Sequence, residues 1–420
     1  MNYKYTSSLS VFKRVTMLLL LSSVLSGCAA FYPQFIKTND KATVSIDRSQ
    51  FGQPIRNNGI GSLVVVPVSI NGVSGFEFVL DTGAATTVIF DTAKTRELNI
   101  VTDGEYEVGG SGSGEKAFAK IGMNVDITIG GATIQKMSPL IMNWEDAKLF
   151  ASEDGVYIDG IIGFDLFDRF AVEVNPQSET VRLLESNSVN NLEADMTSLP
   201  IEIASMERQV YTYIDVFVSE NEEGFSQKVH LDTGATNTLS LIEGENGIRT
   251  DSAATKSTSM GMQGTSSQFY SEVSTIELAG FSLSDLPISI TPKENSKTDR
   301  TARLGSSVME RFRYVIDYAN DRILLEPQTI NKEFIKARFG IGAVPTGTHM
   351  LVRHINDTDA GFQAGLRNGD KINSFNGLSV DEFGFRELAN LEPKLGDKLT
   401  VCFVRESLEE QCLDVFAAPI

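Results

Sequence analysis

The strongest indication of the fold lies in residues Gly75-Phe76-Glu77-Phe78-Val79-Leu80-Asp81-Thr82-Gly83-Ala84. It is an apolar, strand-like run that ends in an acidic turn. The tetrapeptide Asp81-Thr82-Gly83-Ala84 returns 151 residues later as Asp232-Thr233-Gly234-Ala235. Asn71-Gly72, just before the first copy, is a hairpin signal, and residues 62–70 are apolar and β-branched. Two copies of one loop, each closing a strand, predict a duplicated β structure.

The repeat extends well beyond these two loops. Ile161-Ile162-Gly163 leads into apolar strands at 171–175 and 180–184. Its counterpart in the second copy is Arg303-Leu304-Gly305, followed by strands at 313–317 and 322–325. We therefore expect two lobes of similar topology, over residues 56–186 and 198–328.

These features resemble the pepsin and retropepsin clan of aspartic peptidases. The resemblance covers both lobes and implies a mainly β fold of two β-barrel lobes, with Asp81 and Asp232 as the catalytic pair. It also implies supporting roles for the loop residues and for the hydrophobic segment that crosses behind each loop. The supporting residues expected on this basis are Thr82, Gly83, Thr233, Gly234, Ile161, Ile162, Gly163, Leu304 and Gly305.

Two carboxylates about 3 Å apart cannot both ionise, so such a pair shares one proton and activates a water molecule. This chemistry hydrolyses a peptide bond without a cofactor, and the expected partner is a polypeptide substrate. The sequence does not say which Asp is the acid and which the base. Taken alone, each Asp-Thr-Gly is also compatible with an ordinary β-turn capped by Asp.

A glycine-rich segment, residues 107–114, lies between the first loop and the next strand, where the clan places its flexible flap. We expect Gly109, Gly110, Ser111 and Gly112 to cover the substrate. Residues 260–264 are the matching segment of the second lobe. The alternative for both is a glycine-rich surface turn.

Two departures from the clan pattern, and one feature of both loops, concern the dyad. Arg303 replaces the first apolar support residue of the second lobe, so packing behind Asp232 is in doubt. His230 stands where the first lobe has Val79, and we expect it to be a partly exposed strand residue; protonated, it would lower the pKa of Asp232. Ala84 and Ala235 lack the hydroxyl that a Ser would donate to a carboxylate, which predicts a dyad working from mildly acidic to near-neutral pH.

The last 85 residues, 336–420, resemble a bacterial PDZ domain through the series Ala364-Gly365-Leu366, Gly369-Asp370-Lys371-Ile372 and Asn376-Gly377. The resemblance implies a loop that presents backbone amides to a peptide C-terminus. Its residues are Phe339, Gly340, Ile341 and Gly342. Docking within the chain, or regulation, is an alternative to peptide capture.

Cys402 and Cys412 flank two short strand-like runs around a turn near Ser407. In an antiparallel hairpin the two positions lie opposite each other, which makes a disulfide possible in an oxidising compartment. Two separate strand cysteines are the alternative. The remaining cysteine and three dispersed histidines give no zinc-like spacing, so we expect no metal.

The N-terminus carries a targeting signal. Three basic residues precede an apolar stretch at 15–25 that is too short to span a membrane, and Leu25-Ser26-Gly27-Cys28 follows. This order resembles a bacterial lipobox, which implies removal of residues 1–27 and a lipid on Cys28; a signal peptide with a chance Cys is the alternative. Residues 28–55 read as a tether. Because Ala29 follows the Cys, we expect the outer membrane, facing the periplasm.

The formal charge of −19 argues against nucleic acid as a partner. We therefore expect a lipid-anchored envelope endopeptidase, assisted by its PDZ-like domain. One chain supplies both Asp residues, so a monomer suffices. The alternative is a non-catalytic, peptide-binding scaffold lipoprotein that retains the fold.

Overall fold

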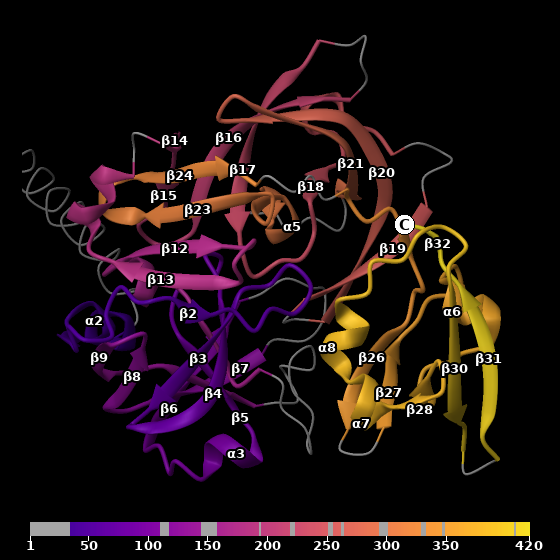
Figure 1. The fold of residues 1–420 in the computed structure, drawn as a ribbon, viewed down its shortest axis with the longest axis horizontal. Helices are drawn as coiled ribbons and strands as arrows, with labels where there is room; N and C mark the ends of the chain where they lie inside the picture. The colour runs from indigo at the N-terminus through magenta and orange to yellow at the C-terminus, as the bar shows by residue number, and fades with distance from the viewer. Residues whose placement is uncertain are drawn as a thin grey trace, which may run out of the picture.

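The computed structural model describes residues 34–109, 117–143, 158–192, 195–218, 223–250, 255–261, 264–293, 301–328, 333–346, 349–406 and 409–420. Within these ranges most regular structure is β: each lobe has a large sheet, a further sheet takes strands from both lobes, and the C-terminal residues form a sheet of their own (Figure 1). The expected mainly β, two-lobed fold is confirmed. No helix in the described part of the chain is both long and apolar enough to cross a membrane.

The first lobe is built on a sheet with the order β1-β9-β8-β3-β4-β11-β5-β10-β7-β6. Short β11 runs parallel to β4 and antiparallel to β5, so it is held at the centre of the sheet. The bounds are β1 Thr43–Ile46, β3 Val65–Ile70, β4 Val73–Leu80, β5 Val88–Asp91, β6 Thr102–Val108, β7 Ala117–Gly122, β8 Val125–Ile129, β9 Ala132–Met137, β10 Leu140–Asn143 and β11 Gly160–Ile162, with helices α3 Ala93–Arg96 and α4 Phe164–Phe167.

The second lobe repeats this arrangement. Its order, β15-β16-β17-β22-β18-β21-β20-β19, places short β22 parallel to β17 and antiparallel to β18, as β11 lies between β4 and β5. The internal repeat is thus a repeat of topology. The bounds are β15 Glu202–Ile203, β16 Val210–Phe217, β17 Phe225–Asp232, β18 Leu239–Ile242, β19 Thr255–Gly261, β20 Gly264–Leu278, β21 Phe281–Thr291 and β22 Ala302–Gly305, with α5 Ser306–Met309 and the 3-10 turn η3 Glu245–Gly247.

A third sheet, β14-β24-β23-β12-β13-β2, joins the lobes. Strand β12 from the first lobe pairs antiparallel with β23 from the second, with Glu173 opposite Val315. The buried carboxylate of Glu173 pairs with Arg182 and with Arg313, so the seam between the lobes carries its own ion pairs. The bounds are β2 Ile55–Arg56, β12 Ala171–Asn175, β13 Thr180–Leu184, β14 Thr197–Pro200, β23 Phe312–Asp317 and β24 Arg322–Pro327, with η2 Ser186–Asn191 and η5 Tyr318–Asn320.

The tether expected over 28–55 is wrong for its described part. Residues 34–40 form helix α2 (Gln34–Asp40), and β1 pairs with β9 at the edge of the first sheet. Phe35 and Ile36 are buried in a cluster with the first lobe's core residues. The polar composition of the segment suggested a solvated tether. Its polar residue Asn39 is instead buried, because its side chain donates hydrogen bonds to the Thr86 hydroxyl and the Ser138 carbonyl in distant segments.

The C-terminal unit forms a separate sheet, β26-β27-β28-β30-β31, in which β29 pairs with β28. Its core contains Leu366, Ile372, Phe375 and Phe403. The bounds are β25 Ala337–Arg338, β26 Gly342–Thr346, β27 His349–His354, β28 Lys371–Phe375, β29 Leu378–Ser379, β30 Lys398–Val404, β31 Gln411–Phe416 and β32 Ala418–Pro419, with α6 Ala360–Ala364, α7 Val380–Phe383 and α8 Phe385–Ala389. This arrangement agrees with a PDZ-like unit, which stays a prediction.

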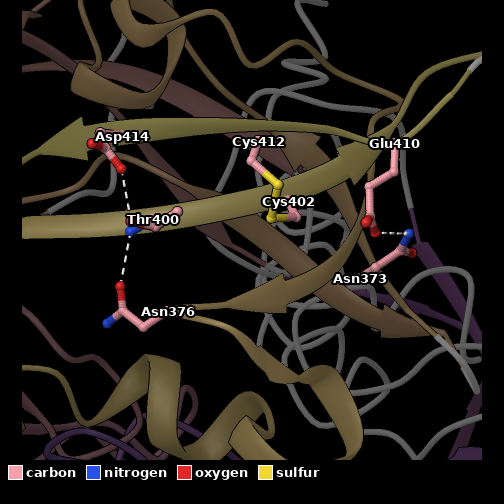
Figure 2. The surroundings of a disulfide bond; sticks show 7 residues. All are labelled: Asn373, Asn376, Thr400, Cys402, Glu410, Cys412 and Asp414. Atoms are coloured by element: carbon pink, nitrogen blue, oxygen red, sulfur yellow. Dashed lines mark hydrogen bonds between the residues drawn. A yellow bond between two sulfur atoms is a disulfide. The ribbon is translucent and has the colours of Figure 1, made fainter.

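The two cysteines of this unit are joined. Cys402 of β30 lies opposite Cys412 of β31 in the antiparallel register, and a disulfide links them (Figure 2). Of the two alternatives that the sequence left open, the structure has the cross-strand disulfide. It pins β31, the outermost strand of this sheet, to its neighbour.

Candidate active site

The two acidic loops follow equivalent strands. Asp81 comes directly after β4, and Asp232 is the last residue of β17. The Asp81 amide donates to the carbonyl of Ile162 at 2.9 Å, so the strand that crosses behind the first loop also holds its acidic residue. The two strands therefore place Asp81 and Asp232 at equivalent positions in the two lobes.

Thr82 and Thr233 connect the loops across the lobe boundary. The Thr82 hydroxyl donates to the carbonyl of Leu231 at 2.7 Å and accepts the Thr233 amide at 3.0 Å. The Thr233 hydroxyl donates to the carbonyl of Leu80 at 2.9 Å and accepts the Thr82 amide at 3.1 Å. Both threonines are buried. Four hydrogen bonds thus hold the two loops face to face.

Each loop glycine lies against the opposite carboxylate. A Cβ atom on Gly234 would lie 2.3 Å from Cγ of Asp81, and one on Gly83 would lie 2.9 Å from Cγ of Asp232. Each glycine amide also donates to its own loop's Asp, at 2.7 Å for Gly83 and 3.0 Å for Gly234. The two carboxyl groups therefore lie together between the loops.

The segments behind the loops also match. A Cβ on Gly163 would lie 2.0 Å from the Ala84 carbonyl oxygen, and one on Gly305 would lie 2.1 Å from the Asn237 carbonyl oxygen. Only glycine permits this approach, which brings the backbone of each loop onto its support. Ile161, Ile162 and Leu304 are buried as expected.

The surroundings of Asp81 favour its protonated form. Burial is the largest cause of a pKa well above the ordinary value, and the negative charge of Asp232 is the next. The Gly83 amide and, more weakly, Arg303 act in the opposite direction. Asp81 is thus equipped to keep a proton at a pH where an ordinary Asp has lost it.

Arg303 does not leave a gap behind Asp232. Its Nε lies 3.2 Å from Oδ2 of Asp232, while its neighbour Leu304 fills the apolar position. The sequence pointed to Arg303 as a departure, but it did not predict this ion pair.

His230 differs from both expectations. Its side chain is buried, and its Nε2 has no hydrogen-bond partner in the described structure. Burial lowers the pKa of His230 to about 4, with Asp232 opposing and Arg303 reinforcing the shift. The imidazole is therefore neutral at mildly acidic and neutral pH, so it is neither a partly exposed residue nor a cation beside Asp232.

The arms of the expected flap form a hairpin. Strands β6 and β7 pair antiparallel up to Val108 and Ala117. Gly109 ends the described part, and Gly110, Ser111 and Gly112 lie outside the described residues. In the second lobe, β19 and β20 pair antiparallel up to Gly261 and Gly264, and residues 262–263 lie outside the described residues.

Two buried groups near the loops were not predicted from the sequence. Asp165, on α4, accepts hydrogen bonds from the Thr86 hydroxyl and from both the amide and hydroxyl of Thr87. Tyr318 is buried, and its pKa is raised by burial and by the charge of Asp81. Neither has a local sequence signal, because their partners lie in distant segments.

The expected carboxylate-binding loop of the C-terminal unit is braced from behind. The Phe339 carbonyl accepts the Gly361 amide at 2.9 Å, and Gly340 has a φ of +61°, which favours glycine. Ile341 packs against the core of the unit, and Gly342 begins β26.

No group of three or more His, Cys, Asp or Glu within the described ranges is placed to hold a metal ion.

The comparisons with known proteins agree with the first lobe. A family model described as aspartyl protease matches residues 66–166, which include Asp81 and the Ile161-Ile162-Gly163 support. No curated protein matches the chain. The match supports an aspartyl protease domain, and the topology of the second lobe repeats that of the matched one.

Proposed function

We propose that this protein is an aspartic endopeptidase that hydrolyses unfolded polypeptides with Asp81 and Asp232 acting as one dyad. The observation that carries the proposal is the reciprocal lock between Thr82 and Thr233, which holds the two Asp-Thr-Gly loops together. An ordinary capped turn has no need of a matching turn 151 residues away. The family match at residues 66–166 supports the same reading.

The chemistry needs one proton on the pair. In that state one carboxylate takes a proton from a water molecule while the other carboxyl donates its proton to the scissile carbonyl oxygen. The buried setting of Asp81 favours retention of the shared proton. The hairpin of β6 and β7 is the element suited to cover an extended substrate.

A cleavage assay in ¹⁸O-labelled water tests this function. The purified protein is incubated with a reduced, unfolded protein substrate between pH 4 and pH 8, and the fragments are identified by mass spectrometry. We expect new C-termini carrying one ¹⁸O, because water supplies the oxygen. The double variant Asp81→Asn/Asp232→Asn is the control, and fragments that persist in it would exclude the dyad.

A non-catalytic peptide-binding scaffold is the second candidate. The observation that favours it is the ion pair between Arg303 and Asp232, which places a cation on a carboxylate that must react. Calorimetry with the same unfolded substrate separates the candidates. Binding without any cleavage supports the scaffold, whereas cleavage lost in the double variant supports the peptidase.

The C-terminal unit is suited to present substrate or to regulate the first lobe. Strand β26 is the outermost of its sheet, so a peptide C-terminus can add to it beside the Phe339–Gly342 loop. The C-terminal unit also contacts the first lobe, because Arg386 on α8 forms an ion pair with Glu77. Glu77 lies on β4, the strand that leads to Asp81. A peptide at β26 would thus bind to a unit that contacts the strand leading to Asp81.

The proposed lipid on Cys28 would hold the enzyme close to a membrane. Helix α2 begins at Gln34, so the chain between the lipid and the first lobe reaches at most about 22 Å. We propose an outer-membrane position facing the periplasm, with envelope polypeptides as substrates. Labelling with a radioactive fatty acid, absent in Cys28→Ala, tests the anchor. A monomeric mass in detergent is expected.

A further inference from the structure

The two lobes differ at one pair of positions beside the dyad. In the first lobe Val79 lies opposite Ile161 in the register of β4 and β11, and both side chains are buried. In the second lobe the equivalent pair is His230 opposite Arg303, in the register of β17 and β22. An apolar pair is thus replaced by two ionisable side chains, next to only one of the two catalytic carboxylates.

Arg303 gives Asp232 an ion-pair partner that Asp81 does not have. One oxygen of Asp232 accepts the Gly234 amide at 3.0 Å, and the other lies 3.2 Å from Nε of Arg303. Asp81 accepts the Gly83 amide, but no ion pair within the described ranges includes it. Ala235 carries no hydroxyl, so the positive charge of Arg303 is what this loop has in its place to favour an ionised carboxylate. Ala84 in the first loop has no such substitute.

Arg303 is the cation that acts on the dyad. Among the described residues, the titratable groups that interact with the pair are His230 on β17, Tyr318 on η5 and Arg303 on β22. The pKa of His230 is lowered to about 4 and that of Tyr318 is raised, so both are neutral near pH 6. An ion pair favours the charged form of a carboxyl group.

We propose that Arg303 is a positioning residue that keeps Asp232 ionised and leaves the shared proton on Asp81, so that Asp232 is the general base and Asp81 the general acid. This assignment rests on the proposed peptidase function. The difference between the lobes then has a chemical consequence. It fixes which Asp is the acid and which is the base before substrate binds.

The proton transfers follow from this assignment. Asp232 takes a proton from water as the water oxygen bonds to the carbonyl carbon, and Asp81 gives its proton to the carbonyl oxygen. The product is a gem-diol, with Asp232 protonated and Asp81 ionised. Asp232 then protonates the amide nitrogen as the C–N bond breaks, and Asp81 recovers a proton from a gem-diol hydroxyl. Both carboxyl groups return to their starting states.

Substitutions at Arg303 test the proposal through the pH profile. Arg303→Ile installs the residue that the first lobe carries at this position, and Arg303→Gln keeps a polar side chain without charge. Both should move the acid limb of kcat/KM to higher pH by about one unit. Arg303→Lys should restore most of the wild-type profile. Lys228→Gln, which removes an exposed cation from β17, the strand that ends in Asp232, should leave the profile unchanged.

A titration that needs no activity separates this proposal from the peptidase function. The carboxyl carbons of Asp are labelled with ¹³C, and the dyad signals are assigned by their loss in Asp81→Asn and Asp232→Asn. We expect Asp232 to ionise first in the wild type, and its titration to move to higher pH in Arg303→Ile and Arg303→Gln.

The outcomes are distinct. If the titration of Asp232 is displaced in the Arg303 variants but the wild type cleaves nothing, the role of Arg303 is supported and the peptidase function is rejected. Cleavage that needs both Asp residues, with titrations and pH limbs unchanged in Arg303→Gln, would keep the peptidase and overturn the role of Arg303. Thermal unfolding identifies variants that fail to fold. If Arg303→Ile fails to fold, the comparison of Arg303→Gln with Arg303→Lys decides whether the charge of Arg303 acts on Asp232.

Discussion

Thr82 and Thr233 hold each other's loops: each hydroxyl donates to the carbonyl just before the other's Asp and accepts the other's amide. Thr82→Ala removes one hydroxyl and leaves the Thr233 amide and the Leu231 carbonyl buried without it. We expect the free energy of unfolding to fall by about 2 kcal/mol, and activity to fall with it.

Urea unfolding measures this effect, and Thr82→Ser is the matched control because it keeps the hydroxyl. The double variant Thr82→Ala/Thr233→Ala should lose less than the sum of the single losses, since both belong to one network. Equal stability of Thr82→Ala and Thr82→Ser would contradict the lock.

Gly234 should tolerate a methyl group less well than Gly83. A Cβ would lie 2.3 Å from Cγ of Asp81 in the first case and 2.9 Å from Cγ of Asp232 in the second. Displacing a catalytic group by about 1 Å costs roughly a hundredfold in rate. We therefore expect kcat of Gly234→Ala to fall by about that factor, with a smaller fall in Gly83→Ala. The reverse order in steady-state kinetics would argue against this packing.

The central fold was predictable because its signals are local and repeated. The loops at Asp81 and Asp232, and the support at 161–163, were each predicted from a short motif, although the groups that they contact lie far away along the chain. Each loop lies at the end of a strand, which predicts its position in the first lobe. The duplication then predicts the same positions in the second lobe. The register of β4 with β11 and of β17 with β22 follows from the same pattern.

The rest depended on partners that the sequence does not reveal. Asn39 reads as polar linker, yet it is buried because it bonds Thr86, 47 residues away. Arg303 reads as a defect in an apolar segment, yet it finds an anion at Asp232. The roles of Asp81 and Asp232 were equally hidden, because identical loop sequences acquire different surroundings only after folding.

Replacing Asp81 with Asn should stabilise the protein at neutral pH. Its raised folded-state pKa means that stability is full below the ordinary value of 3.8 and is lost as pH rises through the folded pKa. Asp81→Asn escapes that loss. Urea unfolding should show the variant more stable than wild type at pH 7 and nearly equal to it near pH 3.8.

Asp47→Asn is the control of opposite sign. Ser49 donates two hydrogen bonds to Asp47 and lowers its pKa, so this carboxylate stabilises the fold above its unfolded pKa. The variant should be less stable than wild type at pH 7. Asp81→Asn behaving like Asp47→Asn would mean that Asp81 is not held in a buried, anionic surrounding.

His230 should make the protein sensitive to mild acid. Its pKa is lowered from 6.5 to about 4, so the unfolded chain binds a proton between these values and the folded chain does not. Stability therefore falls as pH drops through this window. At about 1.4 kcal/mol per pKa unit, the loss between pH 7 and pH 5 is about 2 kcal/mol.

His230→Val carries the residue of the first lobe and should remove this dependence. Unfolding free energies at pH 7 and pH 5 are compared in the variant and the wild type, so any packing change at pH 7 cancels. The same fall in both proteins would show that His230 is not the group responsible.

The dyad itself is tested by the two single substitutions, Asp81→Asn and Asp232→Asn, assayed at the wild-type pH optimum on one unfolded substrate. Each keeps the size of the side chain and removes one carboxyl group from a pair that needs both. We expect initial rates to fall by about 10³-fold in each folded variant. A folded Asp232→Asn protein that cleaves at the wild-type rate would contradict it.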